Sequence, residues 1–250
     1  MMFAHGFGCD QQMWRLVTPA FEDDYRVVLF DHVGAGRSDL SAYFAPKYAS
    51  LEGYADDVVE ILEEHDLRDV IFVGHSVSAM IGVLASLKAP ERFAKLIMLG
   101  PSPRYMDDGD YVGGFTREGV EELLDFLENN HLGWSAAFAP VIMGNGDRPE
   151  LSEELETSFC ATDPDIAIQF ARVTFLSDNR ADLPKVTTPS LILQSSEDVI
   201  ASPLVGQYCH EHLPNSKYVM LEATGHCAHI SAPAATIAAI KDYLKSDPPS

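Results

Sequence analysis

Short apolar runs alternate with helical patterns at both ends of the chain, and this alternation constrains the fold more than any other feature. The apolar, β-rich runs lie at residues 1–5, 26–31, 69–73, 96–99, 190–194 and 218–221. Patterns with helical spacing lie between or after them, at residues 51–65, 77–87, 203–212 and 233–244. Strands that alternate with helices predict an α/β fold, in which a mostly parallel sheet has helices on both faces.

The alternation stops in the middle of the chain, where no run is typical of a strand. The helical patterns of this stretch lie at residues 118–130, 133–140, 150–159 and 164–177. We therefore predict a core made of residues 1–100 and 185–250, with a helical lid made of residues 101–184. Ligands bind at the carboxyl ends of the strands in sheets of this kind, so the lid is expected to cover those ends.

The pentapeptide Gly74-His75-Ser76-Val77-Ser78 lies between a predicted strand and a predicted helix. A tight turn of the G-x-S-x-G type lifts a serine hydroxyl above the sheet, beside the positive end of the following helix. The positions two before and two after the serine must be small. Gly74 meets this demand, and Ser78, in place of the second glycine, meets it with more crowding. Such strings also arise by chance, but the strand–turn–helix setting favours Ser76 as a nucleophile.

A serine hydroxyl is a weak nucleophile until a base takes its proton. His226, in a loop after the last predicted strand, is the candidate base, and the alternative is an ordinary surface histidine. An acid must then fix the tautomer of that histidine. Glu197 and Asp198 both follow the run at residues 190–194, and the residues alone leave the choice between them open. The chain order serine, acid, histidine is the one expected for a triad on an α/β sheet.

A serine that attacks a carbonyl carbon needs two donors for the oxyanion that forms. The first candidate is the backbone N–H of Val77, directly after the nucleophile. The second is the N–H of Phe7 in the loop His5-Gly6-Phe7-Gly8, where the glycines let the backbone approach a substrate closely. The alternative for this loop is a plain connection between a strand and a helix.

The predicted lid is rich in aromatic side chains, at Tyr105, Phe115, Trp134, Phe138, Phe159, Phe170 and Phe175. Most aromatic residues pack in a core. Those close to Ser76 would instead line a small apolar pocket. Such a pocket suits an uncharged ester or lactone rather than a sugar phosphate.

The net charge of −21, from 38 acidic and 17 basic residues, repels nucleic acids and anionic lipid surfaces, so neither is an expected partner. No apolar run approaches the roughly 18–20 residues that cross a bilayer. The four cysteines are widely spaced, which favours reduced thiols in the cytoplasm. No coiled-coil pattern is present, which favours a monomer.

Neither a metal nor a cofactor is predicted. The group His226-Cys227-Ala228-His229 is compact, but no second pair of ligands has a metal-binding spacing. No G-x-G-x-x-G motif or P-loop follows a predicted strand. Residues 34–36 (Gly-Ala-Gly) resemble a phosphate loop only superficially, and a turn near the mouth of the site is the preferred interpretation.

Several of these motifs, taken together, resemble the RsbQ family, the bacterial α/β-hydrolases of the energy-stress sigma-factor pathway. The matching segments lie at residues 5–11, 74–86, 113–115, 160–164 and 225–227. Residues 74–82 also resemble the plant strigolactone and karrikin receptors of the same superfamily. The resemblance implies an α/β-hydrolase fold with a four-helix lid, and it identifies Asp198 rather than Glu197 as the acid. It also implies further strands before Met1, without which an edge of the sheet would be exposed.

The resemblance also implies a closed hydrophobic pocket above the serine. Its expected lining is Phe7, Phe115, Trp134, Phe138, Phe159 and Phe175, and His75, next to Ser76, is added to the predicted pocket. Members of this family hydrolyse slowly and signal through a protein partner. The partner is a PAS-domain phosphatase for RsbQ and an F-box protein for the plant receptors.

Three functions remain open. The first is a slow hydrolase that senses a small hydrophobic ligand and passes the signal to a partner in stress regulation. The second is an ordinary metabolic carboxylesterase without a signalling role. The third is a ligand-binding module whose triad is vestigial, and the intact Ser76, Asp198 and His226 count against it.

Overall fold

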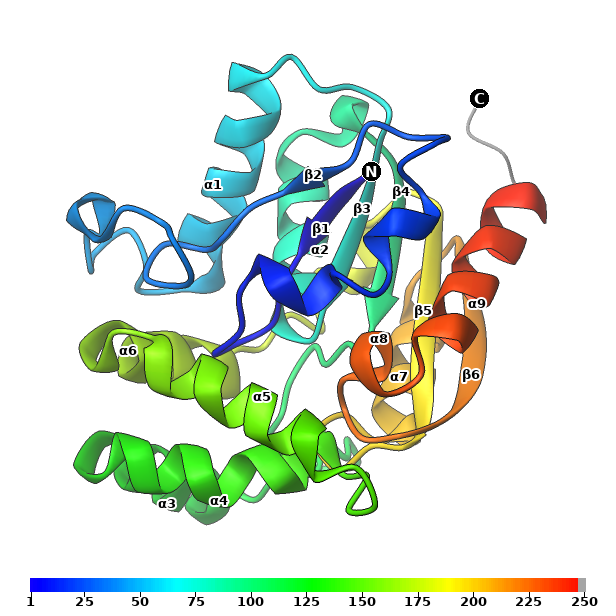
Figure 1. Cartoon of the computed structure of the whole chain (residues 1–250). Helices are drawn as coiled ribbons and strands as arrows, with labels where there is room; N and C mark the ends of the chain where they lie inside the picture. Colours follow the sequence, from blue (N-terminus) through cyan, green and yellow to red (C-terminus); the bar gives the residue numbers. More distant parts are fainter. Residues whose placement is uncertain (247–250) are drawn as a thin grey trace.

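The computed structural model describes residues 1–246 and contains one sheet with helices on both sides (Figure 1). Within these residues the sheet has six strands: β1 (Met2–Ala4), β2 (Val28–Leu29), β3 (Val70–His75), β4 (Phe93–Leu99), β5 (Ser190–Glu197) and β6 (Ser216–Thr224). They lie in the order β2-β1-β3-β4-β5-β6, and every neighbouring pair is parallel. The predicted α/β fold with a parallel sheet is confirmed.

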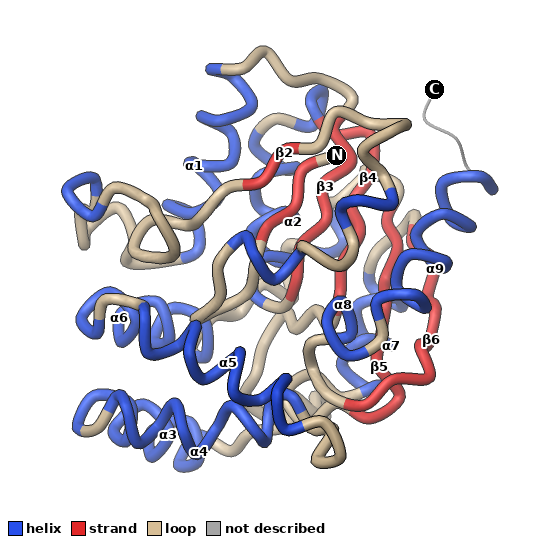
Figure 2. The backbone as a smooth tube through the Cα atoms, viewed as in Figure 1, coloured by secondary structure: helices blue, strands red, loops and turns tan. Residues whose placement is uncertain are grey.

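The two faces of the sheet bury different residues of the same strand, because successive side chains of a strand point to opposite sides. In β3, Phe72 packs with α1, α2 and α7, whereas Ile71 and Val73 pack with α8 and α9. These helices are α1 (Leu51–Glu64), α2 (Val77–Lys88), α7 (Pro203–His212), α8 (Ala228–Ser231) and α9 (Pro233–Ser246). Figure 2 shows the strands between these two sets of helices. Burial on both faces explains why the central strands are continuous apolar runs.

β2 is shorter than the sequence predicts. The run at residues 26–31 predicts a strand throughout, but only Val28 and Leu29 form one, paired with β1. β2 lies at the edge of the described sheet, and both of its residues are only half-buried. An apolar run indicates that a segment is shielded from water, but it does not indicate that a partner strand lies beside every residue. The length of the run therefore overestimates the length of the strand.

The chain between β4 and β5 is helical. It forms α3 (Arg117–Asn129), α4 (His131–Met143), α5 (Pro149–Ala161) and α6 (Pro164–Phe175). These helices, called the lid helices below, match the four predicted helical patterns to within a few residues. Figure 1 shows them in green, below the arrowhead of β4 and so beside the carboxyl ends of the strands. The division of the chain into core and lid at residues 100 and 184 stays a prediction.

Candidate active site

Ser76 lies in the turn between β3 and α2, with a backbone conformation that residues other than glycine rarely adopt. Its φ is 57° and its ψ is −124°. Such a conformation costs about 1–3 kcal/mol and is common at functional sites. The turn is so tight that a Cβ on Gly74 would lie 2.5 Å from the carbonyl oxygen of Ser78. The Ser76 N–H donates to the carbonyl oxygen of Leu99 over 2.8 Å, which ties the turn to β4.

The structure brings Ser76, His226 and Asp198 together from three separate loops. The Ser76 Oγ lies 2.8 Å from His226 Nε2, and His226 Nδ1 lies 2.7 Å from Asp198 Oδ2. All three residues are buried. Because an ionised carboxylate only accepts hydrogen bonds, a neutral His226 ring carries its proton on Nδ1. Its Nε2 is then free to take a proton from the Ser76 hydroxyl.

The acid in contact with the ring is Asp198 and not Glu197. The other oxygen of Asp198 accepts hydrogen bonds from the N–H groups of Ile200 and Ala201, over 2.8 Å and 3.0 Å. These bonds hold the carboxylate in one orientation. Glu197 is exposed, and its carboxylate accepts from the hydroxyl of Thr224 over 3.0 Å. The two neighbouring acids therefore have different environments, which their sequence does not reveal.

His75 connects the turn of Ser76 to the loop of His226. Its Nε2 lies 3.0 Å from the carbonyl oxygen of His226, which can only accept, so Nε2 carries a proton. Burial and the neighbouring histidines hold the pKa of His75 well below its usual value, so the ring stays neutral. The predicted pocket residue His75 thus also fixes the backbone of His226.

The loop that follows β1 runs directly past Ser76. A Cβ on Gly6 would lie 2.6 Å from His75 Nδ1 and 3.3 Å from Ser76 Cβ, so only glycine fits there. Among residues 1–246, neither the Phe7 N–H nor the Val77 N–H donates to another protein atom. The two predicted oxyanion donors are therefore free to bind a ligand atom at this position.

A small cavity of about 40 Å³ lies above Ser76. It is lined by Phe7, Cys9, His75, Ser76, Tyr105, Trp134, Ile142, Leu155, Phe159, Thr174, Phe175, Ile200, His226 and Cys227. No lysine, arginine, aspartate or glutamate is among these residues. The space is enough for a few water molecules, whereas pockets for organic ligands measure about 300–1,000 Å³. An organic ligand therefore fits beside Ser76 only if residues around the cavity, which include residues of the lid helices, move.

Two of the predicted pocket residues do not line this cavity. The lining includes Phe7, His75, Trp134, Phe159 and Phe175. Phe138 instead stacks on the outer side of Trp134, with ring centroids 5.0 Å apart and planes 13° apart. Phe115 packs behind Phe175, with the ring centroids 5.9 Å apart. The aromatic side chains form more than one layer, and a pattern of aromatic residues does not separate the inner layer from the layer behind it.

Sequence reasoning missed a polar group beside the serine. The Tyr105 hydroxyl lies 3.4 Å from Ser76 Oγ. Burial raises the pKa of Tyr105 to about 12, so its proton remains in place at neutral pH. The sequence identifies Tyr105 only as one more aromatic residue of the lid, because no spacing connects it to the pentapeptide. Cys9 and Cys227 also line the cavity, and burial raises the pKa of both thiols, which leaves them protonated and unreactive.

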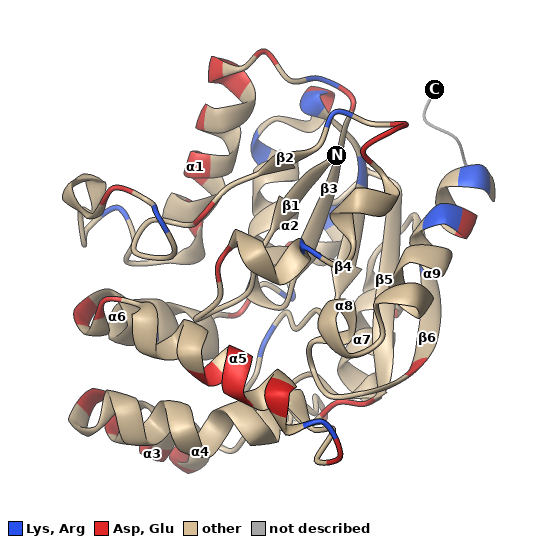
Figure 3. Ribbon diagram, in the orientation of Figure 1, with Lys and Arg blue, Asp and Glu red and all other residues tan. Residues whose placement is uncertain are grey.

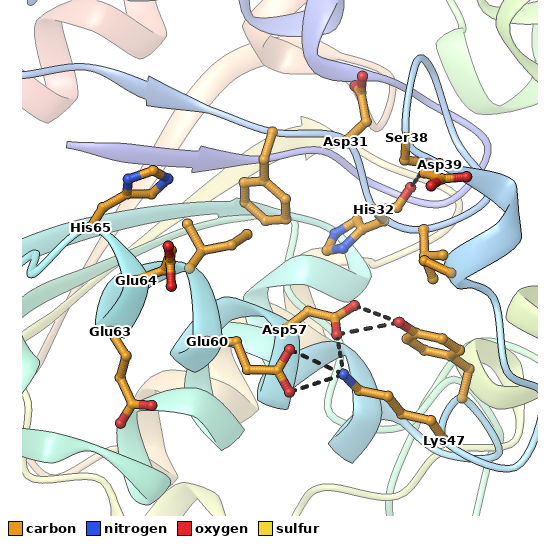
Figure 4. A pocket seen from close by; sticks show the side chains of 15 residues that line it. Asp31, His32, Ser38, Asp39, Lys47, Asp57, Glu60, Glu63, Glu64 and His65 are labelled. Atoms are coloured by element: carbon orange, nitrogen blue, oxygen red, sulfur yellow. Dashed lines mark hydrogen bonds and ion pairs between the residues drawn. The ribbon is translucent and has the colours of Figure 1, made fainter.

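A larger hollow lies elsewhere on the described chain. It is a groove of about 690 Å³ between α1 and the segment after β2, shown in Figure 4. Its acidic residues are Asp31, Asp39, Asp57, Glu60, Glu63 and Glu64. Lys47 forms ion pairs with Asp57 and Glu60, at 2.6 Å and 3.1 Å, and His32 lies on its wall. Figure 3 shows acidic residues on α1, α3 and α5. None of Ser76, Asp198 and His226 lines the groove, so it is not the site.

Within residues 1–246, no group of three or more His, Cys, Asp or Glu side chains is arranged to hold a metal ion. No helix in this part is both long enough and apolar enough to cross a bilayer.

The buried histidines predict a loss of stability in acid. Burial lowers the pKa of His5, His32, His75 and His229, for His229 to about 3. In the unfolded chain a histidine titrates near 6.5, so below that pH the unfolded state binds more protons than the folded state. The free energy of unfolding should be constant above about pH 6.5 and fall below it, by up to about 1.4 kcal/mol per pH unit for each histidine.

Urea unfolding at a series of pH values measures this effect. His229→Phe should reduce the slope by about one proton. The exposed His65 offers a matched control, because His65→Phe should leave the slope unchanged. A free energy of unfolding that stays flat down to about pH 5 would contradict the neutral state of these rings.

The comparisons with known proteins agree with this geometry. A family model described as the alpha/beta hydrolase family matches residues 1–240. A karrikin insensitive 2 receptor of Petunia hybrida is 39% identical over 249 residues, which cover 99% of this chain and 92% of that protein. A strigolactone esterase of Pisum sativum is 38% identical over 235 residues, which cover 93% of this chain and 88% of that protein.

A solved structure extends the agreement to three dimensions. A hydrolase from Oleispira antarctica is 44% identical and superimposes with a TM-score of 0.96, over 98% of this chain and 90% of that one. An esterase from Exiguobacterium antarcticum, 22% identical with a TM-score of 0.90, shares the fold. With the parallel sheet and the serine turn already described, these matches decide the family. The chain belongs to the alpha/beta hydrolase family.

Proposed function

We propose that this protein is a serine hydrolase that cleaves a small hydrophobic ester or lactone, with Ser76, His226 and Asp198 as its catalytic triad. The observation that carries the proposal is the hydrogen-bonded series from Ser76 Oγ through the His226 ring to Asp198, beside a small apolar cavity. A buried serine with this pair of partners is the arrangement that activates a hydroxyl for attack on a carbonyl carbon.

Each residue has a defined role in this reaction. Ser76 Oγ attacks the carbonyl carbon, and His226 Nε2 takes the proton of the hydroxyl. The oxyanion accepts hydrogen bonds from the N–H groups of Phe7 and Val77. His226 then returns the proton to the leaving oxygen, which leaves an ester on Ser76. Water, deprotonated by His226, hydrolyses that ester, while Asp198 stabilises the imidazolium that forms in each step.

The walls of the cavity support an uncharged, apolar substrate. Phe7, Trp134, Phe159 and Phe175 present rings to it, and no side chain of a lysine or arginine lines it to pair with an anion. The similarity to a strigolactone esterase favours a lactone among the esters. In a lactone the leaving oxygen stays attached to the acyl group, so the product remains in the pocket as one molecule.

A regulatory role is the preferred form of this function. The RsbQ resemblance favours slow turnover, and lid helices that move to admit a ligand would offer a changed surface to a partner. The similarity to a karrikin receptor supports a sensor of a small molecule. The RsbQ resemblance points to a PAS-domain phosphatase as partner and to stress signalling. We place the protein in the cytoplasm as a monomer, on the basis of its four unpaired cysteines and the absence of a coiled-coil pattern.

Two alternatives make different predictions. A metabolic carboxylesterase would turn over many short-chain esters rapidly, with a kcat in the usual range of about 1–1,000 per second. A binding module would bind a ligand and move its lid without forming an ester on Ser76. A slow single turnover coupled to lid movement would support the sensor.

The first test is intact-mass spectrometry after treatment with phenylmethylsulfonyl fluoride, with the modified peptide mapped. We expect one sulfonyl adduct on Ser76, because the reagent sulfonylates activated serine hydroxyls and can enter when the residues around the cavity move. His226→Ala should form no adduct, whereas Ser86→Ala, which removes a buried serine of α2 far from the triad, should react normally. An adduct on another residue, or equal labelling of His226→Ala, would overturn the proposed nucleophile.

A further inference from the structure

Ser78 is the residue at which the turn departs from the G-x-S-x-G pattern, and its hydroxyl has partners outside its own helix. The Ser78 Oγ donates to the carbonyl oxygen of His5 over 2.5 Å and lies 2.8 Å from His32 Nε2. Ser78 is completely buried. A serine hydroxyl has one proton, which is used on His5, so Ser78 accepts its second hydrogen bond from His32.

The hydrogen bond between His32 and the Ser78 hydroxyl determines which nitrogen of His32 carries a proton. Its Nε2 carries a proton, and its Nδ1 carries none, because burial holds the pKa of His32 well below its usual value. Within the described chain, Nδ1 has no hydrogen-bond partner. A buried acceptor without a partner costs about 1–3 kcal/mol. The ring is thus held in the orientation that serves Ser78, although that orientation leaves its other nitrogen unpaired.

The network ends on the peptide bond between Gly6 and Phe7. The backbone N–H of His32 donates to His5 Nε2 over 3.0 Å, so His5 carries its proton on Nδ1. That nitrogen donates to the Gly6 carbonyl oxygen over 2.9 Å, and the Cys9 N–H donates to the same oxygen over 3.3 Å. In a trans peptide the N–H points away from the C=O. Fixing the Gly6 carbonyl therefore fixes the direction of the Phe7 N–H.

We propose that Ser78 is a positioning residue that acts through His5, together with His32, to hold the Gly6–Phe7 peptide ready to donate to the oxyanion. The inference rests on the proposed function, since an oxyanion forms only if Ser76 attacks a carbonyl carbon. Ser78 does not touch the reacting atoms. It ties the turn that carries the nucleophile to the loop that carries the second oxyanion donor, and a glycine at this position would lack the tie.

The test compares p-nitrophenyl acetate with its thionoester, in which sulfur replaces the carbonyl oxygen. Sulfur is a weak hydrogen-bond acceptor, so a working oxyanion site favours the oxygen ester. Ser78→Ala should lower kcat for the oxygen ester by about 10- to 100-fold with little change in KM, and should affect the thionoester much less. The ratio of kcat for the oxygen ester to kcat for the thionoester should therefore fall by about tenfold or more.

Ser86→Ala is the matched control, because Ser86 is a buried serine of the same helix whose hydroxyl donates only to Val83, over 2.8 Å. Its ratio should equal that of the wild type. Ser78→Gly, which restores the usual residue of the turn, serves as a second variant and should show the same fall in the ratio as Ser78→Ala.

The outcomes separate the two proposals. Equal losses on both esters in Ser78→Ala, with an unchanged ratio, would mean that Ser78 only supports folding, and would overturn the positioning role while the hydrolase proposal stands. A wild-type rate that persists in Ser76→Ala would overturn the hydrolase proposal and the positioning role with it.

Discussion

Replacing Ser76 by alanine should lower kcat/KM for p-nitrophenyl acetate by about 10³- to 10⁶-fold, to a level that adding His226→Ala barely reduces further. The two side chains act as one unit, because His226 has no hydroxyl to deprotonate once Ser76 is gone. Steady-state kinetics on the two single variants and the double variant measures this non-additivity. Independent losses that multiply in the double variant would contradict a shared step.

The backbone at this position gives a second readout of the same change. Ser76 has a φ of 57°, which glycine adopts without strain and alanine does not. Ser76→Gly should therefore be inactive yet about 1 kcal/mol more stable to urea than Ser76→Ala. If the two variants were equally stable, the turn would not store strain.

Asp198→Asn should lower kcat by about 10⁴-fold, the second largest effect that we expect. An asparagine amide keeps the size of the carboxylate but presents a donor to His226 Nδ1, which favours the tautomer with its proton on Nε2. That tautomer cannot accept from Ser76. The N–H groups of Ile200 and Ala201, which bind the Asp198 carboxylate in the wild type, still find an oxygen in the variant, so the fold should be retained.

Glu197→Gln is the matched control for this change. Glu197 is the neighbouring acid, but it is exposed, and among the described residues its carboxylate accepts a hydrogen bond from the hydroxyl of Thr224. Its replacement should leave kcat unchanged. Comparable losses in the two variants would mean that the acid acts through general electrostatics rather than through its contact with His226, and a loss confined to Glu197→Gln would reverse the assignment.

The Ser76→Ala and Asp198→Asn experiments test the triad, but they do not distinguish a sensor from a metabolic esterase. A sensor and a metabolic esterase share the same triad, so both variants should lose hydrolysis in either case. They differ in what ligand binding does to the lid helices and to a partner. Ser76→Ala, which retains the cavity, is therefore the variant in which ligand binding and partner binding can be measured without cleavage.

The turn at Ser76 and the α/β fold could be predicted from short segments of the sequence, whereas the length of β2 could not. The turn at Ser76 could be predicted because its requirements are local: Gly74 must be small, and a strand must lead directly into a helix. The α/β fold could be predicted for the same reason, since burial on both faces leaves continuous apolar runs. The edge strand β2 was overestimated because its partner strands are not encoded in its own residues.

The lining of the cavity could not be predicted from sequence patterns. Phe159 and Phe138 are both aromatic residues of lid helices, yet one lines the cavity and the other stacks behind Trp134. Helical spacing separates a buried side from an exposed side, but it does not separate successive layers within a core. The position of Tyr105 beside Ser76 depends in the same way on how the segment after β4 folds back over the sheet.

The sequence by itself determined the sheet, the turn of Ser76 and the types of residue that a triad needs, because each depends on contacts within a short segment. Only the tertiary structure decided which aromatic side chains line the cavity, that Tyr105 lies beside Ser76, and that Ser78 joins the turn to the loop of Phe7, and it showed the contact between Asp198 and His226 that the residues alone had left open. These contacts join residues far apart in the chain, and hydrogen bonds of 2.5–2.8 Å depend on side-chain directions that packing alone sets.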